Sequence, residues 1–194
     1  MNKTRLEAFS DGVLAIIITI MVLEIRLPGT YEWAEIKVLL RELEAYAISF
    51  VSVGIYWGNH HHLLHTVKKV NSKIIWSNML LLFFLSLIPF ATRWMAEKGF
   101  DSVTVTLYSA LLLLCGVAYN ILQVTIQRHY PLGEKMNEAL RLQNRKGLIS
   151  LCGYVAAVAA GFFMPLISEI LFIGVSVLWI VPDKNIEKAM EEEG

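Results

Sequence analysis

The chain has 194 residues, of which 56% are apolar and only 18% are charged, a composition too apolar for a soluble globular domain of this size. Its 17 basic and 17 acidic residues cancel, so net charge indicates no nucleic-acid partner, and we expect none. Cys115 and Cys152 both fall in apolar segments, without the paired spacing of a disulfide framework or a thiolate metal site. The composition therefore predicts an all-α, polytopic membrane protein.

Six apolar segments approach the length of about 20 residues that a membrane-spanning helix needs. Pro28 and Gly29 end the first segment, Pro89 predicts a kink in the third, and Pro165 predicts a tight turn between the last two. We expect one six-helix transmembrane domain over residues 1–194, with spans at about 6–27, 44–64, 74–94, 103–126, 148–164 and 165–181. Between the first two spans, residues 28–43 mix apolar and charged side chains and predict an amphipathic helix at the outer interface.

The basic residues divide unequally between the two sides of this arrangement. Twelve Lys and Arg residues lie with the two termini and the even-numbered loops, and five lie on the opposite side. Cytoplasmic loops carry the excess of basic residues in membrane proteins. Both termini are therefore predicted to be cytoplasmic.

The first segment joins a polar cluster to an apolar stripe. At 100° per residue around a helix, Ser10 and Asp11 lie about 120–140° from Ile16. Side chains within about 60° of Ile16 form the stripe, which consists of Ile16, Thr19, Ile20 and Leu23. Spacing alone is equally compatible with a stripe that faces lipid or the protein core, and with an Asp11 that serves as a structural hydrogen-bond partner.

Four of the five histidines lie at the end of the second span. His61 and His65 are four residues apart and share a helix face, as helical metal-binding His pairs do. No carboxylate lies nearby to complete a metal site, so we expect none. We expect instead that one or two histidines, with Trp57 and Asn59, hydrogen-bond to polar residues of the first helix, which are Arg5, Ser10 and Asp11.

Later spans carry polar and small side chains of the kind that join helices inside a membrane. The polar ones are Asn78, Ser86, Ser109, Asn120, Gln123 and Ser150, and the fifth span has a small-residue face of Gly153, Ala156, Ala157, Ala160 and Gly161. No glycine-rich phosphate loop, nucleophile elbow or HExxH motif is present in the sequence. We therefore do not expect an enzyme.

The pattern Arg5-x-x-x-Phe9-Ser10-Asp11, followed by Gly12-Val13 and Ile16-Ile-Ile-Thr19, closely resembles the start of the first helix in the transmembrane protein 175 family of potassium channels. The six spans, the histidines after Tyr56-Trp57 and the chain length resemble its prokaryotic single-repeat members.

This resemblance implies a homotetramer in the cell inner (plasma) membrane, with the first helix of each subunit lining a central pore. It implies a hydrophobic constriction at Ile16, a hydroxyl layer at Thr19, and further apolar layers at Ile20 and Leu23. It also implies a structural polar network, which with the residues noted above consists of Arg5, Phe9, Ser10, Asp11, Trp57, Asn59, His60 and His61.

We therefore expect a passive, potassium-preferring cation channel with K⁺ as the permeant ion and no cofactor. The sequence contains no TVGYG carbonyl filter, so selectivity must come from another device. A ring of four Ile16 side chains near the middle of the bilayer would be a dewetting barrier. The alternatives are a secondary transporter for a metal or a proton-coupled solute that uses Asp11 and the His60–His65 cluster, and a structural or assembly protein with no transport role.

Overall fold

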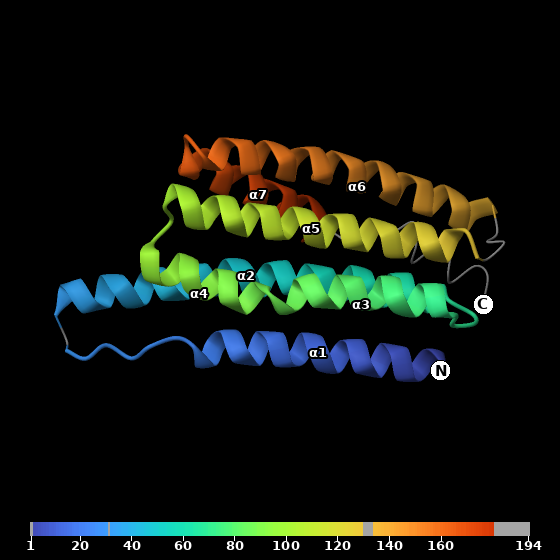
Figure 1. Ribbon diagram of the computed structural model, residues 1–194, viewed down its shortest axis with the longest axis horizontal. Coiled ribbons are helices and arrows are strands. Elements are labelled where there is room, and N and C mark those ends of the chain that lie inside the picture. Colours follow the sequence, from blue (N-terminus) through green and yellow to red (C-terminus); the bar gives the residue numbers. More distant parts are fainter. Residues whose placement is uncertain (1, 31, 130–133, 181–194) are drawn as a thin grey trace.

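The structure is a computed structural model that describes residues 2–30, 32–129 and 134–180, with side chains omitted at 134–139. Within these ranges the chain is all-helical (Figure 1). The helices are α1 (Lys3–Leu23), α2 (Trp33–His65), α3 (Ser72–Ser86), α4 (Ile88–Lys98), α5 (Ser102–Gln127), α6 (Glu134–Gly161) and α7 (Pro165–Ile180). The predicted end of the last span, at residue 181, lies outside the described residues, as do the basic residues of the C-terminus.

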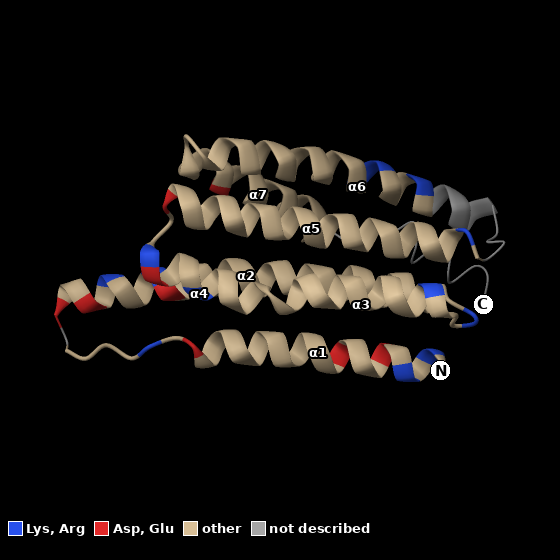
Figure 2. Cartoon of the chain, in the orientation of Figure 1, with Lys and Arg blue, Asp and Glu red and all other residues tan. Residues whose placement is uncertain are grey.

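The helices lie roughly along one direction, with α1 at one margin of the bundle (Figure 1). Helix α1 packs on α2, α3 and α4, while α5, α6 and α7 pack on one another at the opposite side. Charged residues lie mostly near the helix ends, and the long central parts of the helices contain few (Figure 2). This distribution suits a bundle whose middle lies in hydrocarbon.

Helix α1 is shorter than predicted at its C-terminal end. Asn2 caps its start, because the side-chain oxygen accepts a hydrogen bond from Arg5 N at 3.0 Å. The helix ends at Leu23 rather than near residue 27. Beyond it, Arg26 N donates to Glu42 Oε2 at 2.7 Å, and this bond to α2 replaces the helical partner that Arg26 would otherwise have.

The prediction of a separate amphipathic helix before the second span is wrong, because no break separates the two segments. Helix α2 runs without interruption for 33 residues from Trp33 to His65. The physical reason is that no glycine or proline occurs between residues 33 and 53, while alanine, leucine, lysine and glutamate favour continuation. The first part of α2 is therefore the predicted amphipathic segment, joined directly to the apolar part.

The predicted kink in the third span is confirmed as a break at Leu87, between α3 and α4. Pro89 lies in the first turn of α4, where its missing N–H does not interrupt a helical hydrogen bond. At the start of α5, Asp101 Oδ1 accepts from Thr104 N at 2.9 Å. This backbone hydrogen bond holds the pKa of the Asp101 carboxyl below its ordinary value.

Helix α6 begins at Glu134, well before the predicted start near residue 148, so much of the charged connection is itself helical. The predicted tight turn before Pro165 is confirmed, with Met164 N donating to Ala160 O at 2.7 Å. The small-residue face of α6 permits close packing. A Cβ atom at Gly153 would lie only 2.7 Å from Val175 Cγ2 on α7.

Length and composition make three described helical segments apolar and long enough to cross a membrane, namely Lys3–Leu23, Ser72–Lys98 and Ser102–Gln127. Pro165–Ile180 is apolar but shorter. Helices α2 and α6 combine an apolar part with a charged first part, so the count of six spans stays a prediction.

Candidate functional site

Helix α1 has one face buried against the bundle and one face exposed. Its buried residues are Leu6, Ser10, Leu14, Ile17 and Met21. These positions repeat every three or four residues and so form one stripe along the helix. Ser10 is the only polar member of this stripe, and its contacts determine how α1 is held.

A chain of buried hydrogen bonds joins α1 to α3 and α2. Ser10 Oγ donates to Leu6 O at 2.9 Å and accepts from Asn78 Nδ2 at 3.0 Å. Asn78 Oδ1 lies 2.7 Å from His60 Nε2. An amide oxygen can only accept, so in this arrangement His60 carries its proton on Nε2. Asn78 thus uses both ends of its amide to connect the three helices.

A second contact between α1 and α2 lies at the surface, beside these buried hydrogen bonds. Trp57 Nε1 donates to Asp11 Oδ1 at 2.9 Å, and Asp11 remains exposed. The ring of His61 lies 6.2 Å from that of Trp57, centroid to centroid. The Asp11 carboxylate is therefore fixed by α2, but it also stays exposed.

Both ends of α1 are tied to other helices. At the end near the N-terminus, Lys3 Nζ donates to His65 O at 2.8 Å, where a cation suits the C-terminus of α2. At the other end, Arg93 Nη1 donates to Glu24 O at 3.0 Å. The Arg93 side chain also forms an ion pair with Glu97 at 2.7 Å, and Arg26 reaches the same carboxylate at 3.0 Å.

The opposite face of α1 carries the predicted stripe, and it is exposed. The exposed fraction is 59% for Ile16, 42% for Ile20 and 77% for Leu23. Thr19 is also exposed, and its hydroxyl donates to Ala15 O at 2.8 Å. Because that bond uses the hydroxyl proton, the oxygen lone pairs of Thr19 face outward from the helix.

Several predicted members of the polar network lie outside it in this structure. Arg5 and Phe9 are within about 20° of Ile16 around the helix and share the exposed face, so they point away from Asn78 and His60. Within the described ranges, no hydrogen bond or ion pair reaches the Arg5 guanidinium. Asn59 faces α5 instead, where its backbone oxygen accepts from Tyr119 at 3.1 Å.

Asn78 is the residue that the site prediction missed, although it was expected to join helices. A polar amide inside an apolar run is itself a signal of an interhelical contact. The partners Ser10 and His60 lie 68 and 18 residues away in sequence, so spacing could not identify them.

The histidines form no complete metal site in the part of the chain that the structure describes. No group of three or more His, Cys, Asp or Glu side chains there is placed to hold a metal ion. His61 and His65 share a face, with ring centroids 6.5 Å apart. His60 is turned inward and committed to Asn78.

The fold and this site define a multi-pass, all-helical membrane protein whose first helix is anchored on one face and exposed on the other. Residues 5–89 match the family model described as the endosomal/lysosomal potassium channel TMEM175. A protein of Chryseobacterium sp. (strain P1-3), named a potassium channel, is 47% identical over 192 residues, which cover 99% of this chain and 100% of that one. The chain belongs to the TMEM175 family, which confirms the resemblance.

Other relatives agree. A protein of Streptomyces collinus, also named a potassium channel, is 32% identical over 131 residues, covering 63% of this chain and 64% of the relative. The crystal structure of a lysosomal potassium-selective channel TMEM175 homolog from Chamaesiphon minutus superposes with a TM-score of 0.77 at 25% identity, covering 93% of this chain and 97% of that chain. The relatives and the fold are those of an ion-channel family and not of enzymes.

Proposed function

We propose that the protein is a potassium-preferring cation channel, a homotetramer in the cell inner membrane with both termini cytoplasmic. In this proposal α1 of each subunit lines the central pore, K⁺ is the permeant ion and no cofactor is required. The observation that carries the proposal is the exposed stripe of Ile16, Thr19, Ile20 and Leu23 on a helix whose opposite face is anchored. The names of the relatives supply the ion.

The anchoring determines which residues of α1 a pore would receive. Buried polar contacts set the rotation of a membrane helix against its neighbours, whether its other face meets lipid or a pore. Here Ser10, Asn78 and His60 fix which side of α1 faces outward. Thr19 then adds hydroxyl oxygens to the exposed side, where lipid gains nothing from them.

The dimensions of α1 suit this role. Its 21 residues span about 32 Å, close to the thickness of a hydrocarbon core. Ile16 lies about 10 Å from the outer end of the helix, and Thr19 follows about 4.5 Å further along. Four Ile16 side chains would form a ring that expels water when narrow. Thr19 oxygens would replace part of the hydration shell that K⁺ loses there.

Replacement of Ile16 by asparagine tests the constriction in purified protein reconstituted into liposomes. Because asparagine keeps a narrow ring wetted, Ile16→Asn is expected to raise K⁺ flux and to lower the preference for K⁺ over Na⁺. The matched control is Ile170→Asn on α7, since the exposed fraction is 61% for Ile170 and 59% for Ile16. Absence of K⁺ flux from wild-type liposomes under every condition tested would reject the proposal.

The second candidate function is a secondary transporter, favoured by the exposed Asp11 carboxylate, which is bonded to Trp57, and by the His61 ring beside that of Trp57. It predicts saturable, pH-coupled uptake that His61→Ala abolishes while the stripe is intact. Single-channel recording separates the two functions, because a transporter gives no unitary currents.

A further inference from the structure

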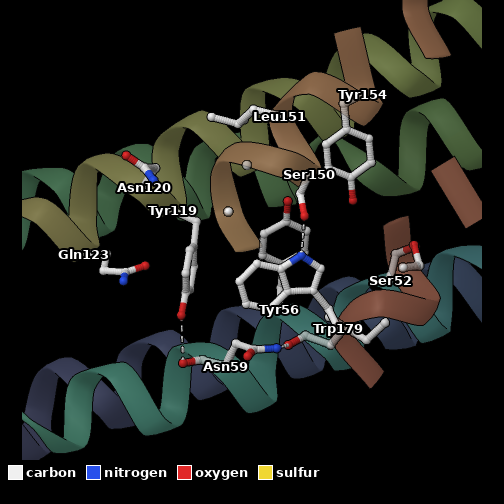
Figure 3. A pocket seen from close by; sticks show the side chains of 14 residues that line it. Ser52, Tyr56, Asn59, Tyr119, Asn120, Gln123, Ser150, Leu151, Tyr154 and Trp179 are labelled. Atoms are coloured by element: carbon white, nitrogen blue, oxygen red, sulfur yellow. Dashed lines mark hydrogen bonds between the residues drawn. The ribbon is translucent and has the colours of Figure 1, made fainter. Parts of the chain in front are cut away.

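A cavity lies inside the bundle between α2, α5, α6 and α7, without contribution from α1 (Figure 3). Its volume is about 50 Å³. A cavity needs about 10–15 Å³ to hold one water, so this one has room for roughly four waters or one small organic molecule.

Aromatic side chains form much of the cavity wall, and three of them, from α2, α5 and α7, contact one another. The ring of Tyr119 on α5 lies edge-on to the rings of Tyr56 and Trp179, with centroid distances of 6.3 Å to both. Trp179 on α7 donates from Nε1 to Ser150 Oγ on α6 at 2.7 Å (Figure 3). The wall is therefore a fixed apolar surface with flat faces, suited to another ring.

The polar groups of the wall have mostly used their donors and kept acceptors. Tyr119 donates to Asn59 O at 3.1 Å, and Gln123 Nε2 donates to Leu140 O at 3.4 Å, which leaves Gln123 Oε1. Asn120 also lines the cavity (Figure 3), and its side chain forms no hydrogen bond with any other described residue. Gln143, which donates to Tyr119, has a buried Oε1 without a partner in those same residues.

No Asp, Glu, Lys, Arg or His belongs to the wall, and the Lys146 ammonium, 4.6 Å from the centre of the Trp179 ring, is already engaged with that ring, so the cavity favours a neutral molecule. We propose that it binds a small neutral molecule with a hydroxyl group on an aromatic body, a compound of the phenol class. The ring packs against Tyr56, Tyr119 and Trp179, and the hydroxyl hydrogen-bonds to the Asn120 amide, whose Nδ2 lies 3.5 Å from a Cβ built at Gly147 on the wall.

Helix α2 connects this cavity to the pore helix. Tyr56 and Asn59 face the cavity, while the intervening Trp57 and the following His60 hold Asp11 and Asn78. A molecule that shifts this turn of α2 therefore acts on the contacts that orient α1. An effect on K⁺ flux rests on the proposed channel function, whereas binding itself does not.

Binding is measured by fluorine NMR on the purified full chain in detergent, with para-fluorophenol and para-fluorotoluene as matched probes. The phenol is expected to bind saturably at one site per subunit, about tenfold more tightly than the toluene, which is the value of one good hydrogen bond. Asn120→Leu is expected to abolish the difference between the two probes by removing the amide that bonds the hydroxyl.

Cavity filling gives the second arm. A Cβ at Gly147 lies 3.5 Å from Asn120 Nδ2 and meets no closer atom, so Gly147→Leu fills the space from α6 and is expected to remove binding of both probes. Gly174→Leu on the exposed side of α7, where a Cβ meets nothing within 4 Å, is the control and should bind like wild type. If Gly147→Leu does not elute from size exclusion like wild type, Ser176→Leu fills the same cavity from α7.

Three results overturn the proposal. The first is the absence of saturable phenol binding, which indicates a cavity that holds water only. The second is equal affinity for the two probes. The third is phenol binding in Gly147→Leu that is as strong as in the wild type. Each is independent of the channel function, because no flux is measured.

Discussion

The two faces of α1 differ little in apolar content but greatly in what holds them. Leu14, Ile17 and Met21 on the buried face match Ile16, Ile20 and Leu23 on the exposed face in size and hydrophobicity. The asymmetry comes from the polar groups, since Ser10 has a buried partner on another helix and Thr19 bonds only to its own helix. In an apolar environment, a few hydrogen bonds therefore decide which of two similar faces turns inward.

Loss of the Asn78 amide is expected to give the largest loss of stability. Asn78→Leu removes the bonds to Ser10 and His60 and leaves the His60 N–H buried without a partner. The free energy of unfolding should fall by about 2–4 kcal/mol, measured by denaturant titration in detergent. The control Ser77→Ala, at a hydroxyl bonded only within α3, should change it much less. Equal effects of both variants would contradict the role given to this chain of bonds.

The attachment at the C-terminal end of α1 is expected to matter less, because its side chains are more exposed. Arg93→Met removes the bond to Glu24 O and the ion pair with Glu97, whose carboxylate is exposed enough to be solvated. We expect a loss of about 1–2 kcal/mol in the same titration. Lys98→Met, one turn further along α4, is the control for the loss of a positive charge. A loss as large as that of Asn78→Leu would show that the two ends of α1 are held equally.

The surface contact between Trp57 and Asp11 should contribute less again. Trp57→Phe keeps a ring in place but removes the donor, and water can solvate the exposed Asp11 carboxylate. The expected cost is about 0.5–1 kcal/mol. Thermal unfolding of this variant beside Asn78→Leu measures the difference between an exposed and a buried polar contact. A cost above that of Asn78→Leu would reverse the ranking.

The exposed stripe should show the opposite behaviour, with little effect on stability and a specific effect on ion preference. Thr19→Val keeps the shape but removes the hydroxyl, and the unfolding free energy should change by less than about 0.5 kcal/mol. In liposomes, its preference for K⁺ over Na⁺ should fall, whereas Thr19→Ser should keep it. An unchanged preference in Thr19→Val would remove Thr19 from the proposed pore lining.

Much of the fold followed from the order of apolar segments and their breakers. Pro165 predicted the turn between the last two helices, and Pro89 predicted the break near Leu87, because a missing backbone N–H acts locally. The sequence did not predict that α2 is continuous, because a change from amphipathic to apolar residues alters the helix surface but need not interrupt the helix. The cavity between α2 and α5–α7 depends on how four helices meet, which periodicity does not describe.

The sequence by itself determined that Ile16, Thr19, Ile20 and Leu23 share one side of α1 and that Ser10 and Asp11 lie on others, because helical geometry fixes angles between nearby residues. The same geometry puts Arg5 and Phe9 within about 20° of Ile16, although the resemblance implied that they belong to the polar network. Only the tertiary structure decided that Asn78 is the partner of Ser10 and His60, and that Arg5 and Phe9 are exposed. Those outcomes depend on the packing of segments far apart in the chain. Several polar residues could have bonded to Ser10, and the packing of the helices buried Asn78 beside it.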